Sequence, residues 1–163
     1  FKVSVPTRSF SKGWERRQIE DNCMKVYDAS DLVLGRLSSV VAKEALLGKE
    51  IVIVNCENAI VTGSKKAILS KFENFKNIGK PFHGPFTPKF PDRIVRRSIK
   101  RMLPYKTSRG SIAYKKIMCY LGIPNEFKDS ELQTIESANL SKLKYSQYMK
   151  IGDFAKIIGK YGK

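Results

Sequence analysis

Hydrophobic positions recur with two different periods, and they predict that strands and helices alternate in the first half of the chain. Residues 24–28 have the composition of a strand, and apolar residues at helical spacing predict a helix over residues 35–47 that ends at Gly48. We expect its inward face to carry Leu37, Val40, Val41, Leu46 and Leu47. Residues 50–56 contain an unbroken apolar run at 51–54, typical of a parallel strand covered on both faces. This order predicts a βαβ unit with a right-handed crossover.

The second half continues with further helices and strands around a proline-rich loop. Ser64 is expected to cap a helix that ends near residue 76, and residues 77–91 hold four prolines and two glycines, typical of an ordered loop. The pattern then predicts a strand over 117–121, a weaker strand over 132–136 and a short helix over 152–158. We therefore expect one α/β domain over residues 24–163.

Residues 93–103 have the pattern of a helix with one apolar face and one basic face. The apolar or small face is predicted to consist of Ile94, Val95, Ser98, Ile99, Met102 and Leu103. The opposite face carries Arg93, Arg96, Arg97, Lys100 and Arg101. Asp92 is expected to cap the start of this helix, and Pro104 to end it. Ser108 is expected to cap a shorter helix that ends near residue 116.

The charge of this segment has one sign throughout. Residues 93–116 contain nine Lys or Arg and no acid, and the chain of 163 residues has a net charge of +16 and a pI near 9.9. Neighbouring like charges on a helix cost a few tenths of a kcal/mol per pair, so an external polyanion is the simplest compensation. The alternative to a bound polyanion is an ordinary basic helix face that is exposed to solvent. RNA, DNA and an anionic membrane surface are the candidate partners, with the membrane least favoured because no apolar run approaches the ~20 residues of a spanning helix.

Residues 1–23 differ from the rest, and we interpret them as an N-terminal extension. They mix Ser, Pro6, Gly13 and charges without a clear period, and they contain no apolar signal-peptide core. The first fourteen residues are basic and free of acids, as in an organelle-targeting peptide, but Glu15, Glu20 and Asp21 argue against that role. We expect a cytoplasmic protein.

The sequence contains little that predicts catalysis, a metal site or a cofactor. His83 is the single histidine, and neither a phosphate-binding loop nor a Gly-x-Gly-x-x-Gly segment is present. Asp28 and Asp31 lie at the end of a predicted strand, where capping the next helix is the favoured role. The three cysteines are widely spaced, which predicts inert thiols in a reducing compartment. We therefore expect no cofactor and no bound metal.

Several short motifs occur in order along the chain. They are Asp28-Ala29, Leu34-Gly35-Arg36-Leu37-Ser38, Val54-Asn55, Ile60-Val61-Thr62-Gly63, Gly84-Pro85-Phe86-x-Pro88-Lys89, Ile94-Val95-Arg96-Arg97, Met102-Leu103-Pro104-x-Lys106-Thr107-x-Arg109-Gly110 and Tyr120-x-Gly122-Ile123-Pro124. They continue through Ala138-Asn139-x-Ser141-Lys142-Leu143 and residues 152–159. Together these motifs resemble the universal thirteenth protein family of the large ribosomal subunit, in its archaeal and eukaryotic branch, and the likeness covers about residues 24–159.

The resemblance implies a three-layer α/β/α fold on a small, mainly parallel four-stranded sheet. It also implies a structural role without enzymatic activity: binding of large-subunit ribosomal RNA, contact with neighbouring ribosomal proteins and support of subunit assembly, with no homo-oligomer expected. The motif residues implied to contact RNA are Gly84, Pro85, Lys89, Arg96, Arg97, Lys106, Thr107, Arg109 and Gly110. To these we add, from their charge or neighbouring motifs, Arg36, His83, Arg93, Lys100 and Arg101.

Two positions depart from the family pattern. Lys100-Arg101 stands where the family usually has Arg-Gly, which adds a cation and puts a close backbone approach there in doubt. His83 stands where an arginine usually precedes Gly-Pro.

Two other functions are compatible with the residues. An RNA-processing or nucleotide-using enzyme would use carboxylates at strand ends, with Asp28, Asp31 and Glu57 as candidates. A free-standing DNA- or RNA-binding regulator would have the same basic surface without the ribosome.

Overall fold

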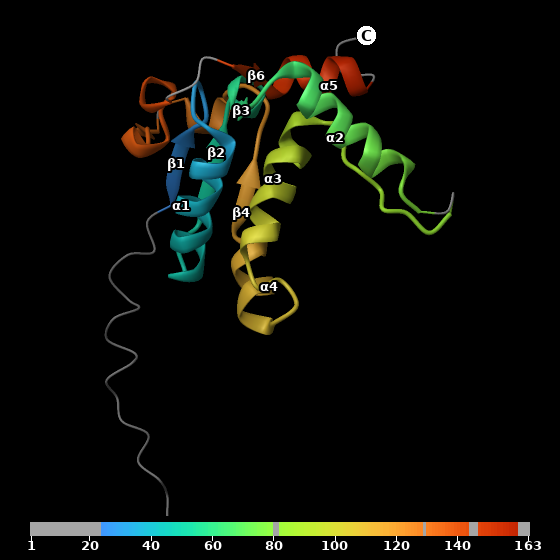
Figure 1. Cartoon of the computed structure of the whole chain (residues 1–163). Coiled ribbons are helices and arrows are strands. Elements are labelled where there is room, and N and C mark those ends of the chain that lie inside the picture. Colours follow the sequence, from blue (N-terminus) through green and yellow to red (C-terminus); the bar gives the residue numbers. More distant parts are fainter. Residues whose placement is uncertain (1–23, 80–81, 129, 144–146, 160–163) are drawn as a thin grey trace, which may run out of the picture.

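The structure, a computed structural model, describes residues 24–79, 82–128, 130–143 and 147–159 (Figure 1). Its centre is a four-stranded sheet in the order β4-β2-β1-β5, in which every pairing is parallel. The strands are β1 (Lys25–Asp28), β2 (Ile51–Val54), β4 (Ile117–Cys119) and β5 (Leu132–Gln133). All four residues of β2 are buried, as its unbroken apolar run predicts. This sheet confirms the expected α/β class and its four strands.

Three helices cover one face of the sheet. They are α1 (Leu34–Leu46), α3 (Pro91–Met102) and α4 (Ser108–Lys115). Val95 and Ile99 of α3 are fully buried and pack with Leu37 and Val41 of α1 in the largest core cluster, which also contains Ile53 of β2. The apolar face predicted for the basic helix is therefore the face that joins it to the core.

A smaller apolar cluster lies on the opposite face of the sheet. Val26, Val52 and Val54 are buried there against Tyr120 and Phe127. Phe127 belongs to a short 3₁₀ segment, η3 (Asn125–Phe127). The parallel sheet is thus enclosed between a layer of three α-helices and a thinner layer of short segments.

A second, two-stranded sheet pairs segments far apart in the sequence. Strand β3 (Ile60–Thr62) is antiparallel to β6 (Tyr148–Lys150), with Val61 opposite Met149. The sequence did not indicate either strand, because three residues are too few to show a period. The short 3₁₀ segments η2 (Cys56–Asn58), η4 (Glu136–Ala138) and η5 (Leu140–Lys142) complete this side of the fold.

Helix α2 (Lys65–Asn77) extends away from the parallel sheet, and the chain returns along it to α3 (Figure 1). Helix α5 (Ile151–Ile158) packs on its base, where Ile68, Met149 and Phe154 form a third apolar cluster. The rings of Phe72 and Phe154 meet edge to face with their centroids 5.5 Å apart. The far half of α2 and the following loop therefore stand clear of the main core.

The helix starts follow the predictions in one case and differ in three. Ser64 caps α2, since its Oγ accepts a hydrogen bond from the Ala67 amide at 3.3 Å. The cap of α4 is Thr107 rather than Ser108, and Thr107 Oγ1 accepts from the Gly110 amide at 3.3 Å. Asp92 does not cap α3: the helix begins at Pro91, so the Asp92 carboxylate lies inside the first turn.

The start of α1 is the third difference. Val33 precedes the helix without a side-chain cap, and neither Asp28 nor Asp31 supplies one. Asp28 Oδ1 instead accepts hydrogen bonds from the Ser30 amide at 2.9 Å and from Asn55 Nδ2 at 3.0 Å. The carboxylate therefore joins the ends of β1 and β2.

Two side chains expected to face inward are exposed. Leu47 is 65% exposed because α1 ends at Leu46, and Met102 is 43% exposed at the last position of α3. The terminal turn of a helix leaves the packed face as the chain changes direction. Over the described ranges, no helix combines the length and the apolar character needed to cross a membrane.

Candidate nucleic-acid interface

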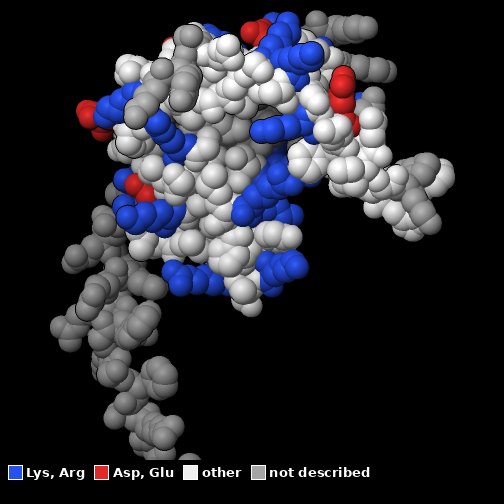
Figure 2. All heavy atoms as spheres, viewed as in Figure 1, with Lys and Arg blue, Asp and Glu red and all other residues white. Residues whose placement is uncertain are grey.

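Helix α3 carries its basic side chains on the face turned away from the core. Figure 2 shows Lys and Arg side chains over α3 and α4, while the acidic side chains in this view lie away from them. Arg93 and Arg101 are exposed, and Arg96, Arg97 and Lys100 are half-buried. The periodicity predicted this division of α3 correctly except at Met102, which is exposed at the end of the helix.

Aromatic rings hold four of these five cations. The guanidinium of Arg96 lies 4.8 Å from the centroid of the Tyr114 ring of α4. The other contacts are Arg93 on Phe90 at 5.7 Å, Lys100 on Tyr105 at 5.0 Å and on Tyr114 at 5.6 Å, and Arg101 on Phe75 at 5.5 Å. A ring face attracts a cation without neutralising its charge. The rings therefore restrain the side chains and leave the positive field in place.

Carboxylates hold other cations. Among the residues that the structure describes, the ion pairs join Lys25 to Glu44 at 3.3 Å, Lys150 to Asp31 at 3.9 Å and Lys156 to Asp153 at 3.9 Å. None of these pairs involves a basic residue of α3. The basic face of α3 is thus available to an external anion.

Arg97 is the basic residue of α3 that contacts backbone instead of a ring. Its Nη1 donates a hydrogen bond to the Phe86 carbonyl oxygen at 3.1 Å, which fastens the proline-rich loop to α3. Arg96 Nε and Asp92 Oδ1 are buried, and neither has a hydrogen-bond partner within the described parts of the chain.

The turn between α3 and α4 adds the exposed residues Lys106 and Thr107, and Arg109 is exposed in the first turn of α4. Thr107 Oγ1 donates to the Pro104 carbonyl at 2.8 Å while it caps α4, which fixes the turn. Gly110, which the family motif implies to contact RNA, is buried. Its backbone packs on Pro104 so closely that a Cβ would overlap the Pro104 carbonyl oxygen.

The proline-rich loop presents both cations and rings. His83, Pro85 and Lys89 are exposed, and Phe82 and Phe86 are 92% and 75% exposed. Gly84 has a φ of +77°, which favours glycine, and its carbonyl lies where a Cβ of Gly79 would stand. The backbone at Gly79 therefore lies in close contact with the backbone at Gly84.

The structure brings the predicted RNA-contacting residues together, with the exception of Arg36. Arg97 links the loop to α3, and Tyr105 and Tyr114 link α3 to the turn and to α4. Arg36 lies apart on the first turn of α1, where Nη1 donates to the Ser137 carbonyl at 3.2 Å. Arg36 is therefore directed toward η4 rather than toward the basic face of α3.

Sequence reasoning missed the aromatic partners. Tyr114 of α4 and Phe75 of α2 hold cations of α3, yet neither was among the predicted site residues. An aromatic residue interleaved in a basic run, as Tyr114 is, was the available signal. Phe75 gave no such signal, because it lies on a different helix.

The candidate catalytic carboxylates each have a structural partner. Asp28 accepts from Ser30 and Asn55, and Asp31 pairs with Lys150. Glu57 accepts from the Gly122 amide through both oxygens at 3.1 Å. Across the described ranges, no three His, Cys, Asp or Glu side chains gather where they could hold a metal ion.

Two of the three thiols can be placed. Cys56 is buried and Cys119 is half-buried, while Cys23 lies outside the described residues. Hydrogen bonding to the Cys119 thiol, together with burial, raises the pKa of Cys56 far above its ordinary value. Cys56 therefore stays protonated and poorly nucleophilic.

Fold and surface together define a class: a small basic α/β protein with a ring-supported cationic face. A family model described as Ribosomal protein L13 matches residues 22–126. The chain is 41% identical over 136 residues to the large ribosomal subunit protein uL13 of Methanococcoides burtonii, covering 83% of this chain and 98% of that protein. It is 43% identical over 137 residues to the uL13 of Methanosarcina barkeri, again covering 83% and 98%.

The uL13 of Archaeoglobus fulgidus is 38% identical over 135 residues, covering 82% of this chain and 86% of that protein. The chain belongs to the ribosomal protein L13 family. This membership confirms the resemblance noted in the sequence and the class of function expected from it, since the family consists of structural proteins of the large ribosomal subunit.

Proposed function

We propose that this chain is a structural constituent of the large subunit of the cytoplasmic ribosome and binds its ribosomal RNA through α3, the turn at 104–110 and the loop at 78–90. The observation that carries the proposal is the basic face of α3, held by aromatic rings and unpaired with acids in the described residues. The planar guanidinium group of Arg can donate two hydrogen bonds to one phosphate. Aromatic rings that already restrain the Arg side chains reduce the entropy cost of ordering them on binding.

The role is non-enzymatic. Asp28, Asp31 and Glu57, the candidates for catalysis, are engaged in contacts that join β1, β2 and the following loops. The partners are RNA and neighbouring ribosomal proteins, and the protein acts as one copy per subunit. Residues 24–163 form the domain that binds the ribosomal RNA, and residues 1–23 are an N-terminal extension of this domain.

The test is incorporation of the double variant Arg96→Glu/Arg97→Glu into large subunits. We expect it to fold, because both residues lie on the outer face of α3, and to remain in light fractions on sedimentation instead of moving with the subunits. Arg97→Glu also removes the bond to the Phe86 carbonyl, so Arg96→Glu alone tests the charge with the loop still fastened to α3, although it gives up the contact with the Tyr114 ring. The matched control is Lys128→Glu/Lys142→Glu, two exposed lysines on and after short 3₁₀ segments, which makes the same change in net charge.

Normal assembly of Arg96→Glu/Arg97→Glu would contradict the assignment of this face to RNA. The free-standing regulator makes a different prediction. Such a protein would stay in light fractions even with its native sequence, at physiological salt.

A further inference from the structure

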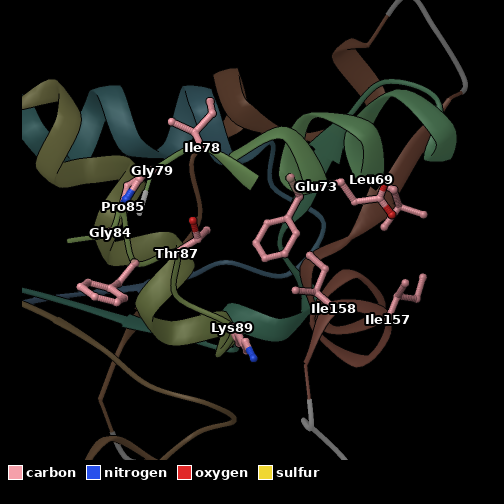
Figure 3. A pocket seen from close by; sticks show the side chains of 12 residues that line it. Leu69, Glu73, Ile78, Gly79, Gly84, Pro85, Thr87, Lys89, Ile157 and Ile158 are labelled. Atoms are coloured by element: carbon pink, nitrogen blue, oxygen red, sulfur yellow. The ribbon is translucent and has the colours of Figure 1, made fainter. Parts of the chain in front are cut away.

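A hollow lies between α2, the proline-rich loop and the end of α5 (Figure 3). Its volume is about 580 Å³, within the ~300–1,000 Å³ usual for small-molecule sites. Apolar side chains from all three elements line it, and in Figure 3 Ile158 of α5 lies across the hollow from Pro85 and Thr87 of the loop. The site is therefore a concave apolar surface, built by segments remote in sequence.

The walls also hold polar groups, one of which lacks a partner. Thr87 Oγ1 is buried, and within the described residues it has no hydrogen-bond partner. The lining also contains the exposed Lys89 and one acid, Glu73 of α2. A buried hydroxyl without a partner is costly, so an occupant that can exchange a hydrogen bond with Thr87 is favoured over a purely apolar one.

The loop that forms one wall is fixed before anything binds. Arg97 of α3 donates to the Phe86 carbonyl at 3.1 Å, and the backbones of Gly79 and Gly84 cross in close contact. Phe86, which also lines the hollow, is 75% exposed. An exposed ring on a fixed loop is a stacking surface for a nucleobase.

We propose that this hollow receives one unstacked base of large-subunit ribosomal RNA, an inference that rests on the proposed function. The base would stack against the Phe86 ring and exchange a hydrogen bond with Thr87, while Lys89 and Arg97 attract the flanking phosphates. Proteins recognise unpaired RNA bases in this way, by aromatic stacking combined with hydrogen bonds to the base edges. Charge favours RNA over a peptide, because the cations at the loop continue the basic face of α3.

The test is ultraviolet crosslinking of the full-length protein within purified large subunits, followed by mass spectrometry of peptides carrying a nucleotide. We expect a nucleotide adduct on the peptide that contains Phe86 and a second adduct on α3. Ile157→Trp places an indole in the hollow from an exposed position, and it should abolish the loop adduct while the α3 adduct persists. Leu47→Trp is the matched control, because it adds the same ring at an exposed apolar position at the end of α1.

Thr87→Val removes the hydroxyl and keeps the shape of the side chain. We expect it to weaken the loop adduct roughly fivefold, the loss that follows from removing one neutral hydrogen bond. An α3 adduct without a loop adduct, a loop adduct unchanged by Ile157→Trp, or a chemical crosslink from Lys89 to a neighbouring protein would each overturn the proposal. Absence of adducts on both segments would instead contradict the proposed function.

Discussion

The guanidinium carbon of Arg96 lies 4.8 Å from the centroid of the Tyr114 ring, so α4 supports a cation that α3 carries. Lys100 shares the same ring at 5.6 Å. One aromatic side chain thus restrains two cationic side chains. The ring organises the cationic face without reducing its charge.

Replacing Tyr114 with Leu should weaken binding to purified large-subunit RNA by roughly three- to tenfold. The reason is that Arg96 then becomes ordered only on binding, at a cost of about 0.5–1.5 kcal/mol for that side chain. Lys100 stays restrained, because it also lies over the Tyr105 ring at 5.0 Å. Filter binding at a fixed salt concentration measures the change. Tyr114→Phe keeps the ring and should bind like the native protein, whereas equal losses in both variants would show that the hydroxyl matters instead.

Binding to RNA should depend steeply on salt. If about six to ten phosphates are contacted, the affinity should fall by about 10³–10⁵ between roughly 50 and 200 mM salt, by analogy with duplex DNA. A salt titration of the native protein gives the slope, and removing Lys106 should reduce that slope by about one. A flat dependence would contradict a phosphate-based interface.

Replacing Gly110 with Ala should destabilise the fold by about 1–3 kcal/mol, the usual cost of overpacking. A Cβ at this buried position would overlap the Pro104 carbonyl oxygen and displace the turn that carries Lys106. Urea denaturation measures the loss. Gly35→Ala is the control, because a Cβ there meets no atom within 4 Å, and that variant should be neutral or more stable by up to about 1 kcal/mol.

Stability should fall at high pH through Tyr27. Burial and the hydrogen bond from its hydroxyl to Glu44, 3.0 Å long, raise the pKa of Tyr27 above 10.0. A raised pKa means that the folded state favours the neutral phenol, so this contribution is complete below pH 10.0 and is lost as the pH rises through the folded-state value.

The neighbouring Lys25 acts in the same direction. Burial lowers the pKa of Lys25, but interactions with Tyr27 and Glu44 outweigh burial and raise it overall. Urea unfolding between neutral pH and pH values above 10.0 should therefore show a smaller loss of stability for Tyr27→Phe than for the native protein. Parallel pH profiles for the two proteins would contradict this assignment.

The sequence by itself determined the features that depend on neighbouring residues. The unbroken apolar run of β2 specified a buried parallel strand, and the period of α3 separated Val95 and Ile99 from the cations on the other face. Ser64 likewise predicted its own helix start. Such features could be predicted because burial and capping act over one turn or one strand.

Only the tertiary structure decided which remote residues meet. Val61 pairs with Met149, and Arg101 lies over Phe75, because the packing of helices and sheets brings segments together that share no local pattern. The same packing exposed Leu47 and buried Gly110, and it left the Thr87 hydroxyl without a partner in a hollow of the described structure. The physical reason is that contacts between distant segments depend on shape complementarity across the whole fold, which no single stretch of sequence contains.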